Sequence, residues 1–176
     1  MNVKKIVMTV ITMLAIAATG TCFAISKEDF VIGSIYLGQP LKEAIAKYGQ
    51  PVAKEQSNEY PRYYFVKEGK SKWFLVDTMP NDDKSILSVA INGDINLATK
   101  AGIKIGSTAA DLKKAYGEPN ACLDTNNNPV SMDDKNYQYP CIVNYEADGW
   151  SLQFMLAWGK DGKEREVISM AMRVKV

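Results

Sequence analysis

Apolar residues at helical spacing occur in two short stretches, Leu41, Ile45 and Tyr48, then Leu112, Ala115 and Tyr116. Each stretch is followed by Gly-x-Pro, a pattern typical of a helix that ends in a left-handed glycine. The sequence therefore predicts two short helices. Thr108 and Asp111 are spaced as a capping box for the second helix, and Pro40 suits the first turn of the first.

After each predicted helix the apolar period falls to two, and β-branched and aromatic residues become frequent. The predicted strands cover residues 52–56, 62–67, 72–77, 85–92, 121–123, 137–146, 150–158 and 166–175. Tight turns at 68–71 and 147–149 make their flanking strands antiparallel neighbours. In the last strand every second residue is a large apolar one, and these residues are expected to be buried: Ile168, Met170, Met172 and Val174. Residues 26–30 and 97–101 are each expected to form a further short turn of helix.

Two stretches of the chain repeat. Seven residues recur 68 positions later: Ile35, Leu37, Gly38, Glu43, Tyr48, Gly49 and Pro51 return as Ile103, Ile105, Gly106, Asp111, Tyr116, Gly117 and Pro119. Residues 86–91 recur 81 positions later as 167–172, so the second copy is expected to contain insertions, at 124–136 and 159–164. The pattern predicts an α+β fold of two tandem repeats, 25–96 and 97–176, in one compact domain. Each repeat would pack a short helix on about four antiparallel strands, and the two would lie side by side as one extended sheet.

The face of such a sheet that no helix covers is the candidate binding face. It is expected to carry the small residues Ser88, Ala90, Ser169 and Ala171 beneath tyrosines, which are frequent in protein interfaces. The candidate tyrosines are Tyr60, Tyr63, Tyr64, Tyr137, Tyr139 and Tyr145. Trp73, Trp150 and Trp158 lie in predicted strands and are interpreted as core or sheet-edge residues.

The repeated order of Ile-x-Leu/Ile-Gly, a helix with an acidic residue, Gly-x-Pro and antiparallel strands resembles a superfamily of helix-plus-sheet modules. That superfamily includes small outer-membrane assembly lipoproteins of the SmpA-OmlA type and the tandem-repeat beta-lactamase inhibitor proteins. The duplicated arrangement is more similar to the inhibitor proteins, whose two units present a concave sheet to a protein. The resemblance implies binding rather than catalysis. Its matching residues, Gly38, Gly49, Pro51, Gly106, Gly117 and Pro119, are turn and cap positions, so no binding residue is transferred.

The first 24 residues have the order of a secretory signal peptide. Lys4 and Lys5 precede an apolar run over residues 6–18, which is shorter than the roughly 20 residues of a membrane span. Cys22 and Ala24 form a small-x-small site for cleavage after Ala24. The protein is therefore expected to be exported, either periplasmic or secreted. Acylation of Cys22 is the alternative, although Thr21 stands where a lipoprotein usually has Gly, Ala or Ser.

The net charge argues against nucleic acid as a partner, and the remaining cysteines are candidates for a disulfide. Two of the 21 basic residues belong to the predicted signal, which leaves 19 against 20 acidic residues and no electrostatic footprint for nucleic acid. Outside the signal, Cys122 and Cys141 are expected to pair as a disulfide in an oxidising compartment. Closing that loop would add about 3 kcal/mol to stability. Two separate buried thiols are the alternative.

The chain contains no histidine, the commonest metal ligand and general base near neutral pH. The acidic groups Asp77 with Asp82 and Asp83, and the polar stretch at 124–134, lack the spacing of a calcium-binding EF-hand. We interpret both as solvated loops and expect no metal, no cofactor and no catalytic residue. The predicted function is recognition of a protein partner, in the envelope or outside the cell, through the open sheet face and the long second-copy loop. Binding of a small molecule or a cell-wall fragment is the alternative.

Overall fold

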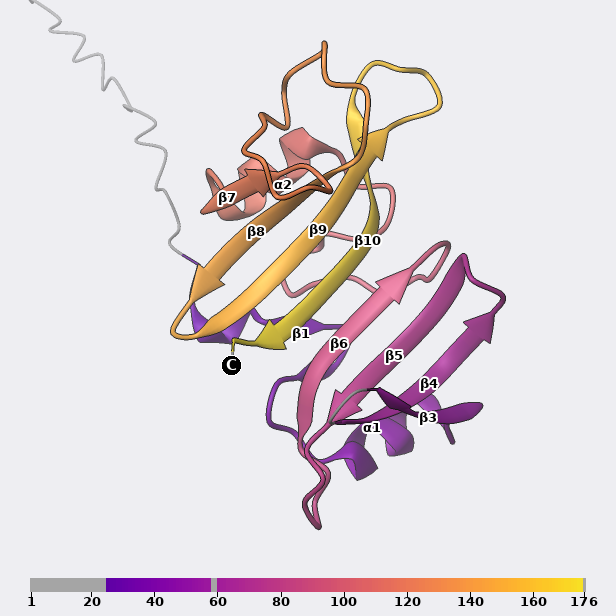
Figure 1. Cartoon of the computed structure of the whole chain (residues 1–176). Helices are drawn as coiled ribbons and strands as arrows, with labels where there is room; N and C mark the ends of the chain where they lie inside the picture. The colour runs from indigo at the N-terminus through magenta and orange to yellow at the C-terminus, as the bar shows by residue number, and fades with distance from the viewer. Residues whose placement is uncertain (1–24, 58–59, 176) are drawn as a thin grey trace, which may run out of the picture.

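The structure is a computed structural model that describes residues 25–57 and 60–175 (Figure 1). The predicted signal peptide and Cys22 lie outside the described residues. The described part is an α+β fold with two α-helices, a large antiparallel sheet and a small two-stranded sheet. In chain order its elements are the 3-10 helix η1 (Lys27–Asp29), β1 (Val31–Ile32), β2 (Ile35–Tyr36), α1 (Leu41–Tyr48), β3 (Ala53–Ser57), β4 (Tyr60–Glu68), β5 (Lys72–Thr78), β6 (Ile86–Asn92), α2 (Ala109–Tyr116), β7 (Ala121–Leu123), β8 (Cys141–Ala147), β9 (Trp150–Trp158) and β10 (Arg165–Val174).

Both helices end at the glycines that the sequence predicts and α2 begins at its predicted cap, whereas Pro40 is the N-cap of α1 and not a residue of its first turn. Thr108 and Asp111 form the capping box of α2, in which the Asp111 N–H donates to the Thr108 hydroxyl at 3.1 Å and the Thr108 N–H to the Asp111 carboxylate at 2.9 Å. Gly49 and Gly117 end the helices with φ of 85° and 76°, a backbone region that glycine enters without steric cost. Within the described residues, neither helix has the length or apolar character needed to cross a bilayer.

The large sheet has the strand order β3-β4-β5-β6-β10-β9-β8-β7, and every neighbouring pair is antiparallel. Chain order alone would place β6 far from β10, yet these two strands join the halves of the sheet. Ala90 lies directly opposite Ala171 at this junction. Figure 1 shows α1 behind the β3–β6 end of the sheet and α2 behind the β7–β10 end, so both helices lie on the same face.

One hydrophobic core lies between that face and the helices. Its members include Leu41, Ala44, Leu112 and Tyr116 from the helices, and Val89, Ile91, Met170, Met172, Leu152 and Phe154 from the strands. All these strand residues except Met170 are completely inaccessible, and Met170 is 1% exposed. Burial of this apolar surface is the main force that holds the helices to the sheet.

Backbone hydrogen bonds tie the residues before each helix to a central strand. The Gly38 N–H donates to the Ile86 carbonyl at 2.7 Å, and the Gly106 N–H donates to the Val167 carbonyl at 2.8 Å. In return, Ile86 donates to Gln39 at 2.9 Å and Val167 to Ser107 at 2.8 Å. The start of each helix is therefore positioned by the strand that joins the two halves of the sheet.

All eight predicted strands are present, with ends displaced by one or two residues except at β8. Residues 137–140 were expected to begin β8 but belong to the preceding loop. The predicted helical turn at 26–30 contains η1, whereas the one expected at 97–101 is wrong. There Ala98 and Thr99 form isolated β-bridges to Lys104 and Ile32, because the backbone hydrogen bonds of this segment go to a neighbouring extended strand.

The predicted burial of Ile168 is also wrong. The pairing of β10 with β9 shifts register between Val167 and Ser169, as in a β-bulge. A bulge inserts one residue and reverses the alternation of faces at that point. Val167 is consequently 1% exposed and takes the core position, while Ile168 is 36% exposed.

Candidate functional site

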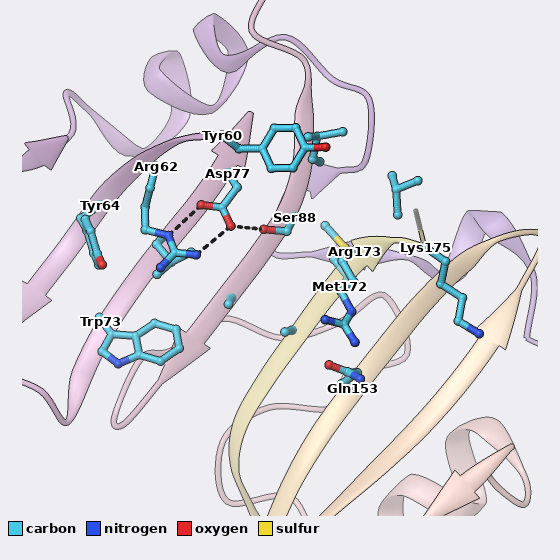
Figure 2. Close-up of a pocket in the computed structure, with 15 residues that line it drawn as sticks. Tyr60, Arg62, Tyr64, Trp73, Asp77, Ser88, Gln153, Met172, Arg173 and Lys175 are labelled. Carbon is cyan, nitrogen blue, oxygen red and sulfur yellow. Dashed lines mark hydrogen bonds and ion pairs between the residues drawn. The ribbon is translucent and has the colours of Figure 1, made fainter. Parts of the chain in front are cut away.

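The face of the sheet opposite the helices carries a groove of about 850 Å³ (Figure 2). Side chains of β4, β5, β6, β9 and β10 line it, together with Lys175 just after β10. Ala90 and Ala171, paired across the sheet junction, form its floor. Three of the four small residues predicted for this face, Ser88, Ala90 and Ala171, line the groove, whereas Ser169 does not.

A row of polar residues crosses the sheet along one side of this floor. The strand registers place Arg62 opposite Asp77, Asp77 opposite Ser88, and Ser88 opposite Arg173 across the junction. Residues opposite each other in antiparallel strands point to the same face and are close enough to interact. The row therefore combines three consecutive strands, β4, β5 and β6, with β10, which is distant in sequence.

Arg62, Asp77 and Ser88 form a hydrogen-bonded network in this row. The Arg62 guanidinium donates from Nε to Asp77 Oδ1 at 2.7 Å and from Nη2 to Asp77 Oδ2 at 3.0 Å, and Ser88 Oγ donates to Asp77 Oδ2 at 2.8 Å (Figure 2). The hydrogen bond to Asp77 raises the pKa of Arg62 further above its ordinary value. The network is neutral overall, and its two-pronged geometry holds the guanidinium plane fixed above the sheet.

Two cations, Arg173 of β10 and Lys175 just after it, line the β10 side of the groove. Lys175 lies 2.5 Å from a carboxylate oxygen of Glu146, so its charge is compensated. Arg173 is exposed and lies between Ser88 and Ser151, both uncharged. Within residues 25–57 and 60–175, Arg173 forms no ion pair. It is therefore the uncompensated positive charge of the groove.

Aromatic side chains form the wall on the β4–β5 side. Tyr60, Tyr64 and Trp73 line the groove, and Figure 2 shows Trp73 on the same side as Tyr64. Trp73 is half-buried, whereas Tyr64 is 9% exposed, with the Lys67 ammonium 4.5 Å from the centre of its ring. The groove thus combines an aromatic wall, a floor of alanine and a cationic wall.

The six candidate tyrosines do not lie together. Tyr60 and Tyr64 line the groove, as predicted. The assignment of Tyr63 and Tyr145 to this face is wrong, because both belong to the core, at 7% and 1% exposed. Adjacent strand residues point to opposite faces, so Tyr63 and Tyr64 cannot share one.

Tyr137 and Tyr139 lie in the loop between β7 and β8, away from the groove lining. Their rings are 5.9 Å apart, and Tyr139 is 70% exposed. The buried guanidinium of Arg165, at the start of β10, donates to the carbonyl of Tyr139 at 2.8 Å and to that of Tyr137. No residue of this loop lines the groove, so the loop and the open sheet face are separate surfaces.

Cys122 and Cys141 are free thiols in the structure. Cys122 pairs with Val143 in the β7–β8 ladder, which puts it on the same face as Cys141, two residues from Val143. The two side chains are in contact: the interaction with Cys141, together with burial, raises the pKa of the Cys122 thiol. The predicted disulfide stays a prediction.

Of the acidic residues that the sequence singled out, Asp124 and Asp77 are hydrogen-bonded within the protein, whereas Asp82 and Asp83 are exposed. Asp124 Oδ1 accepts hydrogen bonds from the backbone of Asn126 at 2.7 Å and of Asn128 at 2.8 Å. The side-chain and backbone donors of Asn128, with that of Asn126, lower the pKa of Asp124. Asp77 binds Arg62, while Asp82 and Asp83 are exposed between β5 and β6. The described residues contain no group of three or more His, Cys, Asp or Glu side chains placed to hold a metal ion.

Sequence reasoning missed most of the polar groove residues. Arg62, Trp73, Asp77, Gln153 and Arg173 all line it, but none was among the predicted site residues. Strand alternation could have indicated Arg62, because it is two residues from both Tyr60 and Tyr64 and therefore points to the same face of the sheet. Trp73 was interpreted as packing, and its position beside the groove follows from the pairing of β5 with β6.

The chain is thus an α+β protein whose antiparallel sheet has helices on one face and a polar and aromatic groove on the other. No protein-family model matches it, and comparison with curated proteins finds no match. Among solved structures it is similar to a DUF4309 family protein (YjgB) from Bacillus subtilis, at 14% sequence identity and a TM-score of 0.45. That likeness covers 77% of this chain and 78% of the other.

Proposed function

We propose that this protein is an exported, non-enzymatic binding module that recognises a protein partner through the groove on its open sheet face. The observation that carries the proposal is the composition of that groove. Tyr, Trp and Arg are the residues enriched in protein interfaces and at their energetic centres. Here Tyr60, Trp73 and Arg173 surround an alanine floor low enough to admit a side chain.

We further infer that the two halves of the sheet are copies of one unit. The backbone hydrogen bond between Gly38 and Ile86 has a counterpart between Gly106 and Val167. Gly106 follows Gly38 by 68 positions and Val167 follows Ile86 by 81, the two offsets of the sequence repeat. Ala90 and Ala171, which are equivalent in the repeat, pair with each other. A copy pairing with a copy in this way has the self-complementary geometry of a two-fold interface. The groove would then lie at the junction of the copies, with Arg173 at the position equivalent to Asn92.

The proposal of export rests on the order of charge, apolar residues and small residues in the first 24 positions. The proposal of binding agrees with the resemblance to two-unit inhibitor proteins, whose open sheets contact a partner. It also agrees with a candidate site that contains a fixed Arg-Asp pair and aromatic rings but no histidine. Rigid side chains lose little conformational entropy on binding, which favours recognition.

The experiment compares two variants that carry the same substitution on opposite faces. Ala90→Arg fills the floor of the groove, while Ala46→Arg adds the same side chain at an exposed position of α1. Each immobilised protein is used to capture partners from the envelope and culture medium of the cells that make it. The affinity of any purified partner is then measured by calorimetry.

A partner that binds the wild type and Ala46→Arg equally, and binds Ala90→Arg at least tenfold more weakly, supports the proposal. A partner whose affinity is unchanged by Ala90→Arg places recognition elsewhere and overturns it. Circular dichroism spectra of both variants should match that of the wild type, since both substitutions are on solvent-facing positions.

The alternative is a small-molecule or cell-wall-fragment binding protein. It is favoured by the groove volume of about 850 Å³, which is in the size range of small-ligand pockets. A thermal-shift screen distinguishes the two. A compound that raises the melting temperature of the wild type with dose, but not that of Ala90→Arg, would support this function instead.

A further inference from the structure

We infer that the partner presents an acidic segment to the groove, with a carboxylate against Arg173 and a neighbouring apolar side chain against Trp73. This inference rests on the proposed function and adds the chemistry of the partner. Its basis is the arrangement of charge in the groove together with the position of the aromatic wall.

The charges of the groove leave one cation available. Among the described residues that line the groove, Asp77 is the only one with a carboxylate, and it already accepts three hydrogen bonds, two from Arg62 and one from Ser88. Lys175 is compensated by Glu146. Arg173 has serines opposite it on both neighbouring strands and forms no ion pair within the described part of the chain. An incoming anion would therefore meet a guanidinium that need not first be released from another partner.

The surroundings of Arg173 favour a carboxylate over a phosphate. A guanidinium fork matches the two oxygens of a carboxylate, and one uncompensated cation balances one negative charge. Ser88 and Gln153 add neutral polar groups at the same wall, whereas a doubly charged phosphate would be expected to need several free cations. The groove therefore fits aspartate or glutamate side chains better than a phosphorylated ligand.

The aromatic wall accounts for the second part of the inference. Trp73 is half-buried, and the strand registers place Ala90 between it and Arg173. An apolar side chain next to the acidic one would bury against Trp73 while the carboxylate contacts Arg173. Burial of that apolar surface would supply most of the affinity, and the charge pair would supply selectivity and a faster association.

The test is a selection from a random twelve-residue peptide library displayed on phage, carried out on the purified protein. We expect the selected peptides to be enriched in Asp and Glu next to aromatic or aliphatic residues. Binding of a selected peptide, labelled with fluorescein, should weaken about tenfold with Arg173→Gln and should not change with Lys42→Gln. Lys42 is the matched control because it is an exposed cation on α1, on the other face of the sheet. Selection on Arg173→Glu should enrich Lys and Arg instead.

The outcomes separate this inference from the proposed function. Peptides that lose affinity with Trp73→Ala but carry no acidic preference, or keep their affinity with Arg173→Gln, overturn the inference and leave recognition through the groove standing. A selection whose peptides are unaffected by both Trp73→Ala and Ala90→Arg overturns both. If no acidic peptide is selected, but labelled polyphosphate binds and loses affinity with Arg173→Gln, the groove takes a phosphate polymer and the inference is wrong.

Discussion

Replacement of Arg165 by alanine is expected to detach the long loop between β7 and β8 and to destabilise the protein. Arg165 is 1% exposed, although it forms no ion pair among the described residues. Its guanidinium donates to the carbonyls of Tyr137 and Tyr139, and it lies 4.6 Å from the ring centre of Trp158 and 5.5 Å from that of Tyr137. Carbonyl oxygens and aromatic faces thus take the place of a counterion.

The magnitude follows from these contacts. A hydrogen bond from a charged donor contributes about 1.5–3 kcal/mol, and a desolvated cation–π contact about 2 kcal/mol. The cost of removing the guanidinium from water offsets roughly half of that sum. After truncation of Arg165, the Tyr137 carbonyl still accepts one hydrogen bond, since Trp158 Nε1 donates to it at 3.0 Å. We therefore expect Arg165→Ala to lower the free energy of unfolding by about 3 kcal/mol, or the melting temperature by about 10 °C.

The assay is urea denaturation of the purified protein, followed by the fluorescence of its tryptophans. Arg173→Ala is the matched control: it removes an arginine from the same strand, but an exposed one, and should cost about 0.5 kcal/mol or less. Arg165→Lys keeps the charge and loses the planar fork, so it should also destabilise. Limited proteolysis should cut residues 124–140 faster in both Arg165 variants. If Arg165→Ala is no less stable than Arg173→Ala, the guanidinium does not anchor the loop and the reasoning is refuted.

Three further predictions concern single groups. Burial raises the pKa of Tyr116 to about 12, against about 10 in an unfolded chain, so the folded state favours the neutral phenol. The contribution of Tyr116 to the free energy of unfolding should therefore fall by about 2 kcal/mol as the pH rises from 10 to 12, and a fall in Tyr116→Phe as steep as in the wild type would show that another group is responsible. Asp77→Asn should cost about 1–2 kcal/mol in chemical denaturation, because it leaves the half-buried guanidinium of Arg62 without its carboxylate, while Glu68→Gln, in the exposed pair with Lys72, should cost under about 0.5 kcal/mol. Protein isolated after export and denatured without reductant should carry no alkylatable thiol at Cys122 or Cys141, and modification of both would rule out the bridge between them.

The elements of the fold were largely predictable because their signals are local. The Gly-x-Pro ends of α1 and α2 and the capping box at Thr108 depend on residues within one or two turns. The errors occurred where a distant partner decides the conformation. Ala98 and Thr99 are not helical because they form bridges, Thr99 to the distant Ile32, and Ile168 is exposed because β10 contains a bulge against β9.

The candidate site was predicted only in outline. The small residues Ala90 and Ala171 and the tyrosines Tyr60 and Tyr64 lie where the open face was expected. Tyr63 and Tyr145 were misplaced because a tyrosine fits a core as well as a surface, and only the parity of its strand separates the two. The Arg62–Asp77 pair joins residues 15 positions apart whose contact depends on the register of β4 with β5.

The sequence by itself determined the helix ends, the number of strands in the large sheet and the small residues at its centre, since each depends on backbone preferences and on the alternation of side chains. Only the tertiary structure decided that β6 pairs with β10 and that Arg173 stands opposite Ser88, where it forms no ion pair among the described residues. Local sequence patterns determine on which side of its own strand a side chain lies. The charge and shape of a site depend on which strands become neighbours, and that choice is made by burial of the whole core.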